Sequence, residues 1–315
     1  MSNSATPLPP TGPKPPLVPE PTVRPPATND PFSPDYEPRV PAFWQALLLL
    51  PAFWVMAVIL AIPVAVVSKM LKDAAAPAEA LQRLEAWANG FSNLFIFAGL
   101  LLAARAWTRR PAEEVFPFRR TSLLLLPGIV LVAAGFAILT SEVDNILQSF
   151  LPAPAWLREM YVNLSGQGLA SFFLLVVVAP LTEELFFRGF VMTGFLKRYR
   201  PWTAIVLSSL LFSVFHLIPY QYFGAFTLGL VMAWLRWRTG SLWPCILLHA
   251  AANGTVFVVG GLIDVQIPGF NESATQSFQP LWFDLTGVVM AAVGLTALAQ
   301  VVSRRGAVTP AANAV

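Results

Sequence analysis

The sequence predicts an all-α polytopic membrane protein with about eight transmembrane helices. Only 12% of its 315 residues are charged, whereas soluble domains average about 25%. Hydrophobic residues make up 56% of the chain, and the mean hydropathy is +0.63. Too little polar surface remains to cover a water-soluble body of this size. The net charge of +3 is too small for a nucleic-acid footprint, so we expect no nucleic-acid partner.

Three regions follow from the composition. Residues 1–41 hold 14 of the 29 prolines and no apolar run, which predicts an extended, disordered cytoplasmic tail. Residues 42–305 form the predicted eight-helix membrane domain, with a candidate functional core at about 165–260. Residues 306–315 are a short C-terminal tail.

The membrane spans are predicted from windows without Asp, Glu, Lys or Arg, because a helix needs about 20 apolar residues to cross the hydrocarbon core. One window, 201–235, is too long for one span and divides at Pro219, which is flanked by Tyr220 and Tyr222. The other windows are 43–68, 86–102, 121–141, 160–182, 239–263 and 285–303.

The basic residues give the predicted orientation. With eight spans and both termini cytoplasmic, the inner loops and the C-terminal tail hold 12 basic residues and the outer loops hold 4, a clear positive-inside bias. The inner set is Arg105, Arg109, Arg110, Arg119, Arg120, Lys197, Arg198, Arg200, Arg236, Arg238, Arg304 and Arg305; the outer set is Lys69, Lys72, Arg83 and Arg158. Merging the fifth and sixth spans would place Arg236 and Arg238 on the wrong side.

The ionisable residues within the apolar segments concentrate in three short patterns. Such residues are costly in a membrane and mark functional sites. The patterns contain both histidines of the protein, and they are Glu183-Glu184-x-x-x-Arg188, Phe212-x-x-x-His216 and His249-x-x-x-Asn253.

Helical geometry assigns different roles to the two glutamates. Glu184 and Arg188 stand at i and i+4 with the acid first, which favours an ion pair. Neighbouring residues are about 100° apart, so we expect Glu183 and Glu184 not to face the same point. Glu183 then has no charge partner on its own helix and is suited to accept a proton.

The other two patterns supply neighbours for Glu183. If the chain turns near 199–201, Glu183 and His216 lie at matching depths in an antiparallel hairpin. Phe212, one turn before His216, is suited to pack against the ring. His249 and Asn253 form one polar stripe, although His249 is only about eight residues from a predicted loop at Gly240. A long fourth helix that continues through 189–200 would bring His249 closer to the depth of Glu183 and His216.

These residue types suit hydrolysis of a peptide bond. A glutamate and a histidine can remove a proton from water, while a histidine and an asparagine can donate to an oxyanion. Glu183, His216 and His249 could instead bind zinc, although their spacing is unlike H-E-x-x-H. We favour acid–base chemistry that requires no cofactor, and keep zinc as the alternative.

The three patterns, in this order, resemble those of the CAAX-protease and bacteriocin-processing family of intramembrane endopeptidases, which includes the Ras-converting CAAX endopeptidases. The resemblance covers 180–254 and implies that Glu183 and His216 activate water and that His249 and Asn253 stabilise the oxyanion. Glu184 and Arg188 would then be supporting residues. It implies a membrane-associated protein or peptide as substrate, prenylated in the eukaryotic branch.

Two other classes of protein fit some of these residues. In a proton-coupled transporter the same side chains would relay protons, but we find no internal repeat. In a non-catalytic membrane immunity or scaffold protein the motifs would persist without cleavage. The predicted location is the cell (inner) membrane of a prokaryote or the endoplasmic reticulum of a eukaryote.

Overall fold

The computed structural model describes residues 40–108, 110–157, 168–262, 266–271 and 277–306, and within these ranges it contains helices but no strand. Most of the predicted N-terminal tail and nearly all of the C-terminal tail therefore lie outside the described residues. The helices are α1 (Phe43–Asp73), α2 (Ala78–Thr108), α3 (Ala112–Val115), α4 (Leu125–Phe150), α6 (Gly168–Phe172), α7 (Ala179–Glu184), α8 (Met192–Arg198), α9 (Pro201–Phe215), α10 (Pro219–Thr239), α11 (Trp243–Leu262) and α12 (Leu281–Gly306), with π-helical segments η1 (Phe173–Val178) and η2 (Leu185–Val191).

The protein is an all-helical, multi-pass membrane protein. Among the described residues, four helical segments are long and apolar enough to span a bilayer: Phe43–Asp73, Gly90–Thr108, Leu125–Phe150 and Leu281–Arg304. Helix α9 is apolar but shorter. Each predicted window contains helix, but the predicted number of eight crossings is not confirmed and stays a prediction.

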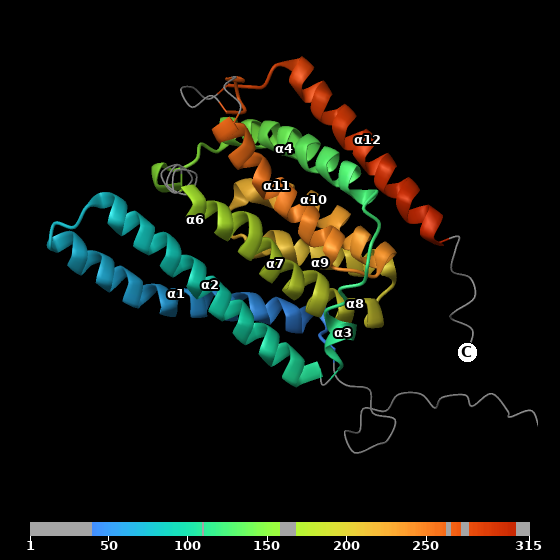
Figure 1. Cartoon of the computed structure of the whole chain (residues 1–315), viewed down its shortest axis with the longest axis horizontal. Coiled ribbons are helices and arrows are strands. Elements are labelled where there is room, and N and C mark those ends of the chain that lie inside the picture. The colour runs from blue at the N-terminus through green and yellow to red at the C-terminus, as the bar shows by residue number, and fades with distance from the viewer. Residues whose placement is uncertain (1–39, 109, 158–167, 263–265, 272–276, 307–315) are drawn as a thin grey trace, which may run out of the picture. The chain divides into compact units, whose positions relative to one another are not determined.

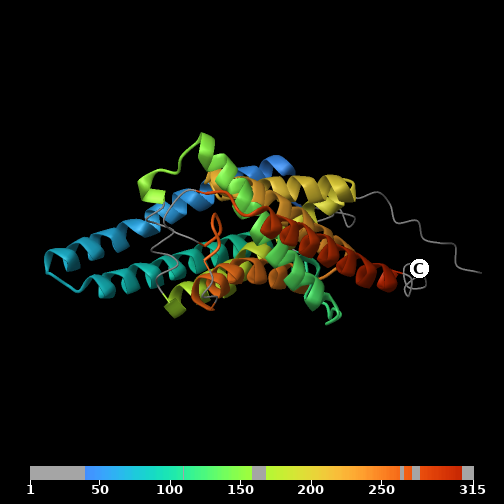
Figure 2. The same ribbon diagram turned by 90° about the horizontal axis from the view of Figure 1, so that it is seen from above.

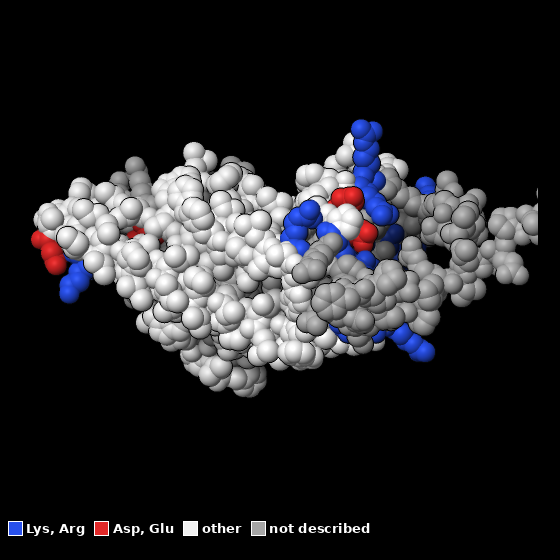
Figure 3. Space-filling view, turned by 90° about the horizontal axis from the view of Figure 1, so that it is seen from below, with Lys and Arg blue, Asp and Glu red and all other residues white. Residues whose placement is uncertain are grey.

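The surface has the distribution expected of a membrane domain. Large apolar side chains are exposed along the long helices, among them Val58, Ile62, Phe95, Leu102, Val130 and Val289. Figure 3 shows almost all of the visible charge of the described residues at two ends, with an uncharged surface between them. Such a belt matches a hydrocarbon layer between two aqueous phases.

The predicted chain reversals occur where the sequence placed them. Helix α8 ends at Arg198 and α9 begins at Pro201, and α10 begins at Pro219. Gly240 follows α10 with a positive φ of 63°, a conformation that glycine adopts without a steric penalty. Helices α9 and α10 are therefore two separate elements, as the predicted break at Pro219 indicated.

The basic ends of several helices meet at one end of the bundle. Arg198 at the end of α8 donates to the carbonyl of Val40, just before α1. Ser241, between α10 and α11, donates to the carbonyl of Arg119, just before α4. One expectation needs correction: Arg236 is not in a loop but in the last turns of α10, where it is 8% exposed.

Helices α4 and α12 pack closely through glycines and lie side by side in Figure 1. A Cβ atom added at Gly135 would lie 2.6 Å from the backbone nitrogen of Ala291 and 2.7 Å from the carbonyl oxygen of Gly287. Gly128 and Gly294 make the same close approach one heptad away. Small residues that let backbones approach are the usual basis of helix association in membranes.

The motif-bearing helices lie between this pair and the α1–α2 hairpin (Figures 1 and 2). Residues 168–198 form one helical run, α6–η1–α7–η2–α8, that includes two π-helical segments. The long fourth helix expected from the sequence is thus present. Directly after the glutamates in the chain, Phe186 and Phe187 belong to an aromatic cluster that packs this run against α1, α2 and α9. The rings of the cluster are Phe53, Phe97, Phe186, Phe187, Phe212 and Phe215.

Candidate active site

The predicted ion pair on the fourth helical run is present and fully buried. Nη1 of Arg188 lies 2.9 Å from Oε1 of Glu184, and neither side chain is exposed. The guanidinium also lies over the Phe212 ring, with Cζ 4.2 Å from the ring centroid. This buried ion pair can orient further groups in an apolar surrounding.

His249 of α11 reaches both glutamates. Its Nδ1 lies 3.0 Å from Oε1 of Glu184, and its Nε2 lies 4.0 Å from Oε2 of Glu183. The two carboxylates thus approach different nitrogens of the same ring, which is compatible with the expectation that they do not face the same point. The shared partner comes from another helix, so the geometry of the glutamates' own helix gave no indication of it.

The hydrogen bond to Glu184 determines which nitrogen of His249 carries a proton. An ionised carboxylate only accepts hydrogen bonds, so Nδ1 is the donor. The neutral ring then has its lone pair on Nε2, the nitrogen that faces Glu183. Oε2 of Glu183 is buried and has no hydrogen-bond partner among the described residues, which leaves this atom free for chemistry.

His216 lies at the end of α9, where its half-buried ring is held by its own backbone. Its Nδ1 is 2.9 Å from the carbonyl oxygen of Phe212, so Nδ1 donates and Nε2 has the lone pair. Glu183 and His249 both act electrostatically on this ring. Phe212 lies edge-on to His216 and His249, with centroid distances of 4.9 Å and 5.5 Å, and so packs against both rings.

Asn253 contacts the same helical run one turn away from His249. Its Nδ2 donates to the carbonyl oxygen of Leu175 at 2.7 Å, within the π-helical segment η1. The predicted polar stripe is therefore present, since both residues bond to the run that includes α7. One N–H of the amide is used in this bond, and the second N–H remains available.

Sequence reasoning missed the contribution of α10, which has none of the three patterns. Nη2 of Arg188 donates to the carbonyl oxygen of Gly229 at 3.3 Å, and Nε of Arg236 donates to the carbonyl oxygen of Arg188 at 3.2 Å. The available signal was an arginine directly after the predicted window 201–235, which the prediction counted as a loop charge.

A zinc site needs at least three ligand side chains grouped around one point. In the part of the chain that the structure describes, no three His, Cys, Asp or Glu side chains are grouped so as to hold a metal ion. Glu183, His216 and His249 therefore do not form such a group in this structure.

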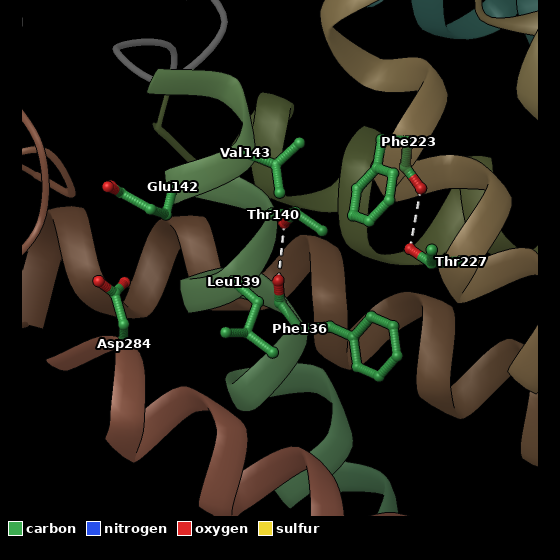
Figure 4. Close-up of a pocket in the computed structure, with 8 residues that line it drawn as sticks. All are labelled: Phe136, Leu139, Thr140, Glu142, Val143, Phe223, Thr227 and Asp284. Carbon is green, nitrogen blue, oxygen red and sulfur yellow. Dashed lines mark hydrogen bonds between the residues drawn. The ribbon is translucent and has the colours of Figure 1, made fainter. Parts of the chain in front are cut away.

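A separate cavity of about 320 Å³ lies between α4, α10 and α12. Figure 4 shows Phe136 and Phe223 on its walls and the carboxylates of Glu142 and Asp284 to one side. None of the predicted site residues lines it. The site with the three motifs is therefore distinct from this cavity.

Comparison with known proteins supports the family resemblance over one segment. Residues 165–255 match the family described as type II CAAX prenyl endopeptidase Rce1-like. An uncharacterized 24.3 kDa protein of Escherichia coli is 32% identical over 112 residues, which cover 33% of this chain and 50% of the relative. The chain thus spans about half the length of that curated relative. No solved structure matches the chain.

Proposed function

Because residues 165–255 match the family described as type II CAAX prenyl endopeptidase Rce1-like, we propose that the protein is an intramembrane endopeptidase. It hydrolyses a peptide bond in a membrane-associated protein or peptide, with a prenylated CAAX-type C-terminus as the first substrate to test. The observation that carries the proposal is the buried carboxylate oxygen of Glu183, which faces an imidazole and has no hydrogen-bond partner in the described structure.

Glu183 and His216 activate the attacking water. The 4.0 Å between Glu183 and His249 is too long for a direct hydrogen bond, but it can be bridged by a water molecule. Glu183 accepts a proton from this water while Nε2 of His216 orients its second hydrogen. The oxygen attacks the carbonyl carbon, and Glu183 then returns the proton to the departing amine.

His249 and Asn253 stabilise the oxyanion. Nε2 of His249 can donate only when the ring is doubly protonated, because Nδ1 already holds the proton shared with Glu184. The second N–H of Asn253 adds a neutral donor, while Glu184 and Arg188 hold the ring in place. The roles proposed for these residues require no cofactor. Zinc bound by Glu183, His216 and His249 is the alternative, and metal analysis of the purified protein tests it.

The orientation in the membrane follows from the basic helix ends. Arg105, Arg198, Arg238 and Arg304 lie at or near the ends of α2, α8, α10 and α12, and the positive-inside rule assigns this end to the cytoplasm. Both termini are then cytoplasmic. The membrane is the inner membrane of a prokaryotic cell or the endoplasmic reticulum of a eukaryotic one.

The test is cleavage by purified full-length protein in detergent, with a prenylated CAAX peptide and a library of membrane peptides as substrates. Glu183→Gln and His216→Gln should each lower kcat about 100- to 10,000-fold. Glu114→Gln is the matched control, because it makes the same replacement at an exposed site on α3. Full cleavage by Glu183→Gln would overturn the assignment, and absence of cleavage by the wild type on every substrate would favour an immunity or scaffold protein.

A further inference from the structure

Helix α10 and the glutamate-bearing run are joined by hydrogen bonds that run in both directions. Arg188 donates from η2 to the carbonyl of Gly229 on α10, and Arg236 donates from α10 to the carbonyl of Arg188. Arg236 also donates to Oγ1 of Thr193 on α8 at 3.4 Å. Three bonds therefore fix one face of α10 to the segment directly after the glutamate pair.

The absence of a side chain at Gly229 lets the two helices approach. A Cβ atom at this position would lie 3.1 Å from Cβ of Ser209 and 3.3 Å from Nη2 of Arg188. Both distances are shorter than ordinary van der Waals contact. Gly229 thus leaves room for the guanidinium that also binds Glu184.

The carbonyl that Arg236 binds lies inside a π-helical segment. In η2 the backbone bonds run from i to i+5 instead of i to i+4, and such segments are frequent at functional sites. A guanidinium donor on a neighbouring helix adds a hydrogen bond to a carbonyl of this segment. This bond stabilises the segment in the register seen here.

Burial of the Arg236 side chain at this position costs free energy. It is 8% exposed, and the oxygens that it binds on Arg188 and Thr193 are neutral. A buried cation whose hydrogen bonds go to neutral oxygens is costly in a membrane domain and marks a functional position. If this position served only helix packing, an apolar side chain of the same length would stabilise the protein more.

We propose that Arg236 is a positioning residue for the catalytic groups: it holds η2 in register, so that Arg188 keeps Glu184 against Nδ1 of His249 and His249 keeps Nε2 toward Glu183. The proposal rests on the proposed function for its catalytic consequence. Its structural part, a link from Arg236 through Arg188 and Glu184 to the His249 ring, holds independently of the reaction.

The chain has a matched control two residues further on. Arg238 lies on the same helix and is exposed, with its guanidinium 5.8 Å from the ring of Trp237. Arg236→Met and Arg238→Met remove the same charge from the same end of α10. Only the first removes a bond to η2.

The structural test uses the two histidines as probes. Full-length protein labelled with ¹⁵N-histidine gives ring signals from His216 and His249 alone, and His216→Gln assigns them. We expect Arg236→Met to shift the Nδ1 signal of His249, Arg236→Lys to restore most of it, and Arg238→Met to leave it unchanged. Identical His249 signals in Arg236→Met and the wild type would overturn the proposal. If Arg236→Met does not fold, Arg236→Gln, which lacks the charge and has a shorter reach, replaces it in this comparison.

The kinetic test separates positioning from folding. Arg236→Met should lower kcat roughly 10- to 100-fold with an unchanged KM, as expected when reacting groups are misplaced by about 1 Å, and Arg236→Lys should recover part of the loss. A loss that only tracks the unfolded fraction, with wild-type kcat in the folded protein, would refute the positioning role. A shifted His249 signal in a protein whose wild type cleaves nothing would refute the proposed function and leave the structural link intact.

Discussion

Replacing Glu184 with glutamine tests how much the buried ion pair contributes to stability. The substitution keeps the size and shape of the side chain but leaves Arg188 without its anion, at a site where neither side chain is exposed. At the 2.9 Å separation of the two atoms, the Coulomb attraction is about 6 kcal/mol for an effective dielectric constant of about 20. Part of this gain is offset by the desolvation of both groups.

We therefore expect Glu184→Gln to lower the free energy of unfolding by about 3–5 kcal/mol, which is the usual cost of removing one partner of a buried pair. The measurement is unfolding by SDS titration in mixed micelles. The double variant Glu184→Gln/Arg188→Met should be more stable than Glu184→Gln alone, because no uncompensated charge remains.

A second ion pair in the chain provides the control. Arg110 and Glu114 have the same i, i+4 spacing and a separation of 3.0 Å, but Glu114 is 46% exposed. Glu114→Gln should cost only about 0.2–1 kcal/mol, as exposed pairs do. If both replacements cost the same small amount, the burial argument is wrong, and with it the view that Arg188 and Glu184 hold His249 in place.

Three further predictions concern the site and its support. Asn253→Asp removes both N–H donors at constant size and should lower kcat about 100- to 1,000-fold with little change in KM; unchanged kcat would exclude Asn253 from the oxyanion site. Gly135→Ala should reduce the stability of the protein in detergent, because its Cβ would lie 2.6 Å from a backbone atom of α12, whereas Gly99→Ala, with nothing within 4 Å, should not; equal effects would refute the close α4–α12 contact. Chelation followed by dialysis should leave cleavage unchanged, and a loss that zinc restores would make Glu183, His216 and His249 metal ligands.

The sequence alone was sufficient to predict a helical membrane protein and the ion pair within one helix. Low charge content predicted a helical membrane domain, since a bilayer requires backbone groups to be satisfied within each helix. Proline and glycine at 201, 219 and 240 predicted the chain reversals, because both residues act through local backbone geometry. Glu184 and Arg188 were paired correctly because their contact depends only on helical periodicity.

Only the tertiary structure could decide which partners these residues meet across helices. The position of the His249 ring between Glu183 and Glu184 depends on how α11 packs against α7, and no spacing within one helix contains that information. The same holds for Arg236, which as a sequence position looks like a loop charge and in the structure is buried against η2. Local contacts are determined by neighbours in the chain, whereas the tautomer and orientation of the buried His249 ring are determined by groups from several helices at once.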